Sequence, residues 1–145
     1  MLRQQTTPLK EMKKVYFYPS ASKGGYKNPY CYNFKQIIAN NFHLLDCENK
    51  ESIAAGWSLL KMSFCADIFI LNWLESIYFH RFGLLQFYIA KTALKIIQLR
   101  RKKIIWIFHN IHPHQGVNAY TIKMQKWLFK NSGFTYCFSK ISNIP

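Results

Sequence analysis

Short apolar runs alternate along the chain with longer segments in which apolar residues recur at helical spacing. The runs are rich in β-branched and aromatic residues, which is typical of buried strands, and they cover residues 15–18, 42–47, 67–75, 104–108 and 134–138. The longer segments predict helices over residues 29–41, 53–64, 84–102 and 119–131. Strands and helices in strict alternation predict an α/β fold, a Rossmann-like parallel sheet of about five strands with right-handed crossovers and helices on both faces.

Capping residues and apolar stripes refine the helix predictions. Asn28 and Pro29 suit the N-cap and the first position of the first helix, whereas Asn118 and Gly133 suit the two ends of the last helix. Helical spacing also selects the residues that should face the core. They are Phe34, Ile37, Ile38 and Phe42, then Ile53, Trp57, Leu60 and Phe64, then Leu85, Ile89, Ala93 and Ile96, and finally Tyr120, Met124, Trp127 and Leu128.

The length and the cysteine pattern limit the class of protein. A chain of 145 residues, 50% of them hydrophobic, suffices for one domain with a true core, and we expect residues 1–145 to form a single domain. Because the chain stops soon after the fifth strand, we expect that domain to be truncated. The cysteines show no C-x-x-C spacing and the N-terminus has no apolar stretch of signal-peptide length, so the sequence predicts a cytoplasmic protein that does not span a membrane.

The charge is strongly unbalanced. Twenty Lys and Arg residues against six Asp and Glu residues give a formal net charge of +14, and such a field attracts phosphate groups on nucleotides, nucleic acids or anionic lipids. The many aromatic residues lie mostly in apolar runs that we expect to be buried in the core, and the sequence has no helix-turn-helix, zinc-finger or RNP-like pattern. We therefore expect no specific nucleic-acid partner, although a basic nucleic-acid-binding module stays open as an alternative.

Polar residues follow three of the predicted strands. Parallel strands end at the same edge of a sheet, and open α/β sheets bind their ligands at that edge. Convergence of three such segments predicts a ligand site there. The candidate residues are Lys23, Gly24 and Gly25 after the first strand, Asn72, Trp73 and Glu75 at the end of the third, and His109, Asn110, His112 and His114 after the fourth.

These residue types suit several roles. His109 could orient a sugar oxygen or act as acid or base near neutral pH, or it could simply bond a neighbouring loop. Glu75 could accept a hydrogen bond from a substrate hydroxyl or pair with one of the many cations. The histidines after the fourth strand are interrupted by Pro113 and have no cysteine or carboxylate nearby in sequence, so we predict no metal site. The Lys23 to Gly25 loop lacks the known phosphate-loop motifs, and a plain surface turn competes with a phosphate-binding role.

Three segments carry a resemblance to a known family. They are Asn28-Pro29-Tyr30, the segment from Ala66 to Glu75, and the segment from Ile105 to His114 with its His-Asn-x-x-Pro-His element. In order and approximate spacing they resemble the N-terminal half of bacterial two-domain glycosyltransferases of the GT-B type, in particular family 4 and the enzymes of capsule and exopolysaccharide synthesis. The resemblance covers residues 15–139.

The resemblance implies transfer of a sugar from a nucleotide-sugar donor to a saccharide or lipid-linked acceptor, at the cytoplasmic face of the membrane and without a further cofactor. It implies that His109 and Glu75 act at the sugar, that Asn72, Trp73, Asn110, His112 and His114 hold the acceptor, and that Lys23, Gly24 and Gly25 lie near the donor phosphates. An anionic membrane surface is a further expected partner. The nucleotide-binding domain of such enzymes is not in this sequence, so we expect little turnover from the chain alone, and an inactive truncated remnant stays open as an alternative.

Overall fold

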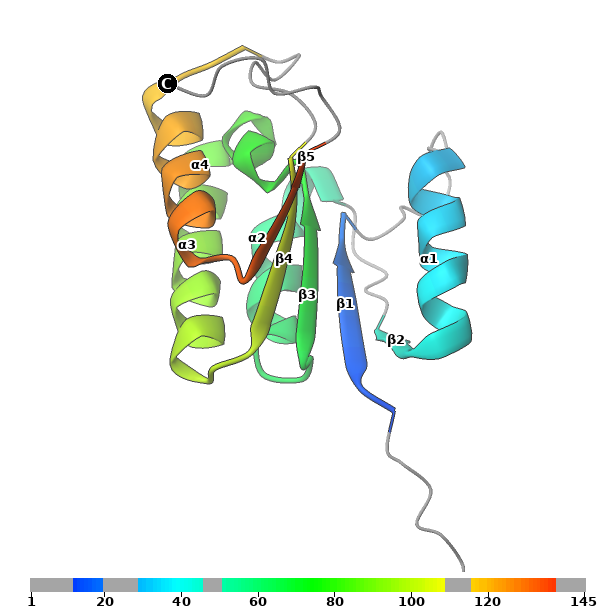
Figure 1. Cartoon of the computed structure of the whole chain (residues 1–145). Coiled ribbons are helices and arrows are strands. Elements are labelled where there is room, and N and C mark those ends of the chain that lie inside the picture. Colours follow the sequence, from blue (N-terminus) through cyan, green and yellow to red (C-terminus); the bar gives the residue numbers. More distant parts are fainter. Residues whose placement is uncertain (1–11, 20–28, 46–50, 109–115, 138–145) are drawn as a thin grey trace, which may run out of the picture.

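The chain forms a five-stranded parallel sheet, as the alternation of strands and helices predicts. The computed structural model describes residues 12–19, 29–45, 51–108 and 116–137 (Figure 1). The strands lie in the order β2-β1-β3-β4-β5, and every pair of neighbours is parallel. Their bounds are β1 Lys14–Tyr18, β2 His43–Leu45, β3 Ile68–Asn72, β4 Lys103–Phe108 and β5 Phe134–Cys137. This arrangement is a Rossmann-like α/β fold.

Helices cover both faces of the sheet, but unequally. In the part of the chain that the structure describes, α1, Pro29–Asn41, is the one helix on its face of the sheet, and it packs there through Cys31 and Ile38. The other face carries α2, Glu51–Met62, α3, Gly83–Leu99, and α4, Ala119–Asn131, together with the 3-10 helix η1, Leu74–Phe79 (Figure 1). Each face has its own apolar core, the larger one under the three α-helices.

The central strands β3 and β4 are buried from both sides. In β3, Phe69 and Leu71 belong to the larger core, whereas Ile70 between them belongs to the core under α1. The register places Leu71 beside Trp106 of β4, which is 2% exposed. A strand covered on both sides has no polar face, which explains why these two runs read as continuously apolar in the sequence.

The apolar stripes predicted for α2 and α3 are only partly confirmed: Ala93 is fully buried and Leu60, Ile89 and Ile96 are half-buried, but other members are exposed. Trp57 and Leu85, both expected in the core, are 55% and 56% exposed. The two helices instead meet closely at Gly56 of α2, where an added Cβ would lie only 2.9 Å from the carbonyl oxygen of Gln86 and 3.4 Å from the Cβ of Ile89. The buried Gln86 side chain then accepts a hydrogen bond from the Gly56 amide at 3.0 Å and donates one to the Arg81 carbonyl at 2.7 Å. Close helix approach thus displaces the large side chains to the flanks. Phe64, after α2, and Ile37, in α1, are likewise exposed.

The third strand is shorter than the apolar run predicts. β3 ends at Asn72, and Trp73 takes a left-handed backbone with φ 51°, after which η1 begins at Leu74. Leu74 and Ile77 of η1 are fully buried, so the apolar run continues as a 3-10 helix rather than as a strand. Gly83 makes the connection to α3 possible, because a Cβ there would lie 1.6 Å from the carbonyl oxygen of Tyr78.

The last helix agrees with its predicted start but not with its predicted end. The Asn118 side chain accepts hydrogen bonds from the amides of Tyr120 and Thr121, both at 2.9 Å, which makes it a true N-cap. At the other end the cap is Ser132 with extended backbone, and its amide bonds the Leu128 carbonyl. Gly133 is therefore not the C-terminal cap that the sequence predicts.

Candidate functional site

The predicted site lies at the carboxyl edge of the sheet, and the structure describes part of it. Asn72, Trp73 and Glu75 follow one another from the end of β3 into η1. The register pairs Asn72 with Ile107 of β4, so these two strands end side by side at this edge. The other predicted residues lie outside the described residues: His109, Asn110, His112, His114, Lys23, Gly24 and Gly25.

Asn72 joins three elements of the fold. Its side chain is fully buried, and its Nδ2 donates a hydrogen bond to the carbonyl oxygen of Tyr18, the last residue of β1, at 3.0 Å. The hydroxyl of Tyr30, in the first turn of α1, donates to Asn72 Oδ1 at 3.5 Å. The amide therefore ties the ends of β1 and β3 to the start of α1, which fixes the shape of the edge.

Trp73 and Tyr30 form an aromatic corner above this amide. Their rings meet edge to face with centroids 6.2 Å apart, and Tyr30 also packs on Phe34 at 5.8 Å. Burial, together with the neighbouring Cys31, raises the pKa of the Tyr30 hydroxyl above 10.0. Tyr30 therefore stays a neutral donor at neutral pH, as its bond to Asn72 requires. Trp73 is half-buried, so part of its surface remains accessible at the edge.

Glu75 is held beneath the edge rather than displayed on it. The residue is 2% exposed, and the indole Nε1 of Trp106 donates a hydrogen bond to its Oε2 at 3.3 Å. Burial raises the pKa of this carboxyl above its ordinary 4.5, and the hydrogen bonds from its own backbone amide and from Trp106 oppose that rise. Burial thus makes the charged form of this carboxyl costlier than it is in water, and the two hydrogen bonds offset part of that cost.

η1 supports this arrangement from the side of the larger core. Tyr78 of η1 stacks on Tyr120 of α4 with centroids 4.6 Å apart and an interplanar angle of 10°, and Phe87 of α3 meets Tyr120 edge to face at 5.1 Å. Aromatic packing of this kind has a preferred geometry and limits sliding between elements. The segment that bears Glu75 is thereby fixed to both α3 and α4.

Sequence reasoning missed three residues of the site: Tyr18, Tyr30 and Trp106. Tyr18 contributes only a backbone carbonyl, which no side-chain pattern reveals. Trp106 had a usable signal, because a buried indole N–H in the middle of an apolar strand needs an acceptor and the chain contains few carboxylates. Tyr30 offers a comparable signal, because it lies in the first turn of a helix that packs on the core, and its hydroxyl there needs a hydrogen-bond partner.

Within residues 12–19, 29–45, 51–108 and 116–137, no group of three His, Cys, Asp or Glu side chains is placed to hold a metal ion. No helix in these ranges is long and apolar enough to cross a membrane. Comparison of the chain with protein-family models, with curated proteins and with solved structures finds no match.

Proposed function

We propose that this chain is the acceptor-side domain of a GT-B-type glycosyltransferase, which holds a saccharide or a lipid-linked acceptor at the carboxyl edge of its sheet. The observation that carries the proposal is the built edge at the end of β3, where Asn72, Trp73 and Glu75 are fixed by hydrogen bonds and ring contacts. The resemblance of the segments 66–75 and 105–114 to such enzymes supports the same interpretation.

The chemistry of the edge suits a sugar better than a flat apolar ligand. Trp73 offers an aromatic surface next to a rigid polar frame, to which the buried carboxyl of Glu75 belongs. A saccharide presents apolar C–H faces that can lie against the accessible part of Trp73, and the buried Asn72 and Glu75 keep the edge beneath that ring in shape. In this proposal His109, one residue beyond the end of β4, acts at the reacting hydroxyl, and the nucleotide-sugar donor binds from the side of residues 23–25.

The test is a titration followed through the tryptophan indole N–H signals of the ¹⁵N-labelled chain, which contains four tryptophans. The probes are the methyl glycosides of glucose, galactose and N-acetylglucosamine. We expect saturable shifts of the Trp73 signal, and smaller shifts of the Trp106 signal through Glu75, with at least one probe. The signal of Trp57, which is exposed on α2, serves as the internal control and should not move.

The outcome that contradicts the proposal is equally clear. If none of the glycosides moves the Trp73 signal, or if all four indole signals move together, the edge does not hold a saccharide. A Trp73→Phe variant identifies the signal and should weaken binding, because the smaller ring offers less contact surface.

A further inference from the structure

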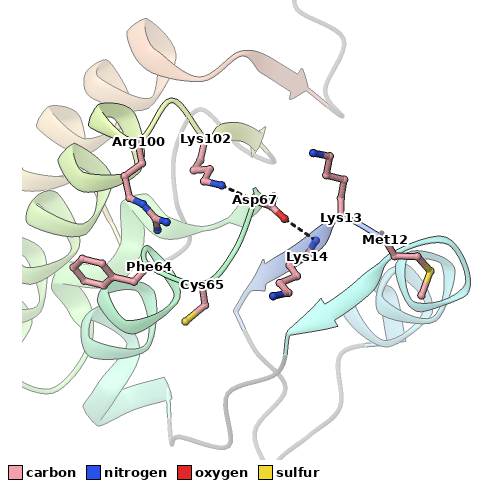
Figure 2. Close-up of a pocket in the computed structure, with 8 residues that line it drawn as sticks. All are labelled: Met12, Lys13, Lys14, Phe64, Cys65, Asp67, Arg100 and Lys102. Atoms are coloured by element: carbon pink, nitrogen blue, oxygen red, sulfur yellow. Dashed lines mark hydrogen bonds and ion pairs between the residues drawn. The ribbon is translucent and has the colours of Figure 1, made fainter. Parts of the chain in front are cut away.

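A second candidate site lies at the opposite, amino-terminal edge of the sheet, where β1, β3 and β4 begin. A pocket of about 410 Å³ opens there, a volume within the range of small-molecule sites (Figure 2). Its lining comes from residues just before or at the start of the three strands and from the residues that follow the end of α2. The residues are Met12, Lys13, Lys14, Phe64, Cys65, Asp67, Arg100 and Lys102.

Asp67 organises the floor of this pocket. It lies directly before β3, and its backbone forms hydrogen bonds with the starts of both neighbouring strands. Its amide donates to the carbonyl of Lys14 in β1 at 2.8 Å, and its carbonyl accepts from the amide of Lys103 in β4 at 3.2 Å. Its carboxylate accepts one hydrogen bond from the Lys14 amide at 3.1 Å and one from Lys102 Nζ at 2.7 Å. These bonds, the one from Lys102 foremost, lower the pKa of Asp67 below 3.8, so the carboxylate is charged at neutral pH.

The cations of the pocket outnumber this single carboxylate. Four cationic side chains line it, and Lys102 alone among them forms an ion pair with a carboxylate of the described residues. Arg100 Nη1 donates a hydrogen bond to the Ser63 carbonyl at 2.6 Å, which holds the guanidinium in place. The other N–H groups of the guanidinium remain for a bound anion. The side chains of Lys13 and Lys14 are exposed at the rim, on the other side of Asp67 in Figure 2.

From this geometry we infer that the pocket at the amino-terminal edge is a binding site for a multiply charged phosphate group. A concave surface lined by one sign of charge concentrates the field and attracts small anions, and a fixed guanidinium suits phosphate oxygens in particular. The site is separate from the proposed acceptor edge, because Asp67 directly precedes β3 at one edge of the sheet and Asn72 ends β3 at the other. The inference therefore does not depend on the proposed function.

Two sources can supply this phosphate chemistry: a free phosphorylated compound and the headgroup of an anionic phospholipid. Inorganic pyrophosphate, titrated by calorimetry at low salt, tests the first. Co-sedimentation with vesicles of mixed phosphatidic acid and phosphatidylcholine, compared with phosphatidylcholine alone, tests the second, because the phosphomonoester of phosphatidic acid carries more than one negative charge. Pocket-dependent binding in either experiment supports the site and identifies its source.

The variant that tests the pocket is Lys13→Gln with Lys14→Gln. Both side chains are exposed, so the fold should tolerate the change, and loss of two cations at the rim should weaken binding by about tenfold or more. The matched control is Lys91→Gln with Lys126→Gln, which removes the same charge from exposed positions outside the pocket and should change affinity by less than about twofold.

A third variant separates a local site from the general charge of the protein. Asp67→Asn removes the one carboxylate among the pocket cations and should tighten pyrophosphate binding by about threefold or more, because Lys102 then becomes available to the anion. The inference is overturned if neither probe binds saturably, or if the Lys13/Lys14 and Lys91/Lys126 variants lose affinity equally.

Discussion

Glu75→Gln should stabilise the protein at neutral pH, although it removes a residue of the candidate site. The folded state raises the pKa of this carboxyl above 4.5, chiefly through burial. Below pH 4.5 the carboxyl is protonated in both the folded and the unfolded chain, so its titration does not change the free energy of unfolding. Above pH 4.5 the unfolded chain loses its proton first, so the free energy of unfolding falls as pH rises towards the folded pKa.

The size of this effect follows from proton linkage. One proton held by the folded state and not by the unfolded state costs about 1.4 kcal/mol of stability for each pH unit of that window. Glutamine is uncharged, fills the same space and can still accept the hydrogen bond from Trp106 through its amide oxygen. The variant therefore escapes the penalty and should unfold at higher urea than the natural chain at neutral pH, with the two converging near pH 4.5.

Urea unfolding followed by circular dichroism at a series of pH values measures this difference directly. Asp67→Asn is the control of opposite sign: because the pKa of Asp67 is lowered, its contribution is fully present above pH 3.8 and is lost as pH falls from that value through the lower pKa of the folded state. That variant should be less stable than the natural chain at neutral pH and approach it in acid. A Glu75→Gln variant that is destabilised equally at every pH would refute the reasoning, because it would mean that the folded state does not raise the pKa.

Two further predictions concern the connections around the site. Gly83→Ala should cost more than about 3 kcal/mol of unfolding free energy, because the new Cβ collides with the Tyr78 carbonyl, whereas Gly133→Ala, whose Cβ would meet its nearest neighbour at 3.7 Å, should stay within about 1 kcal/mol in the same urea experiment. Asn118→Ala should cost about 1 kcal/mol and speed hydrogen exchange in the first turn of α4, whereas Asn118→Ser should largely preserve both; equal exchange in the two variants would contradict the capping role.

The sheet could be predicted from the sequence because its signal is local. Each central strand is a continuous apolar run, and the alternation with helices fixes a parallel sheet once right-handed crossovers are assumed. The strand predicted over 104–108 corresponds to β4, which begins one residue earlier, and the helix predicted over 29–41 has the bounds of α1. The side chains at the strand ends then had to share an edge, which the pairing of Asn72 with Ile107 confirms for β3 and β4.

The helix faces could not be predicted in the same way, because they depend on distances between elements. The predicted stripes included Trp57 and Leu85, but α2 and α3 meet closely at Gly56, where the backbone of Gln86 leaves no room for a Cβ, and both large side chains are exposed. The 3-10 helix after Trp73 was hidden for a related reason. Its buried Leu74 extends the apolar run that predicts a strand over 67–75, and the left-handed backbone at Trp73 is what ends β3 before it.

The unequal cover of the two sheet faces bears on the colloidal behaviour of the protein. On the side of α1, Phe134 and Tyr136 of β5 are 61% and 62% exposed, and in the part of the chain that the structure describes β5 is the last strand at that side of the sheet. At low ionic strength the net charge of +14 keeps molecules apart. Salt shortens the range of that repulsion to about 8 Å at physiological strength, and two such aromatic strips can then touch. The ionic strength of the medium therefore sets the concentration at which the molecules remain dispersed.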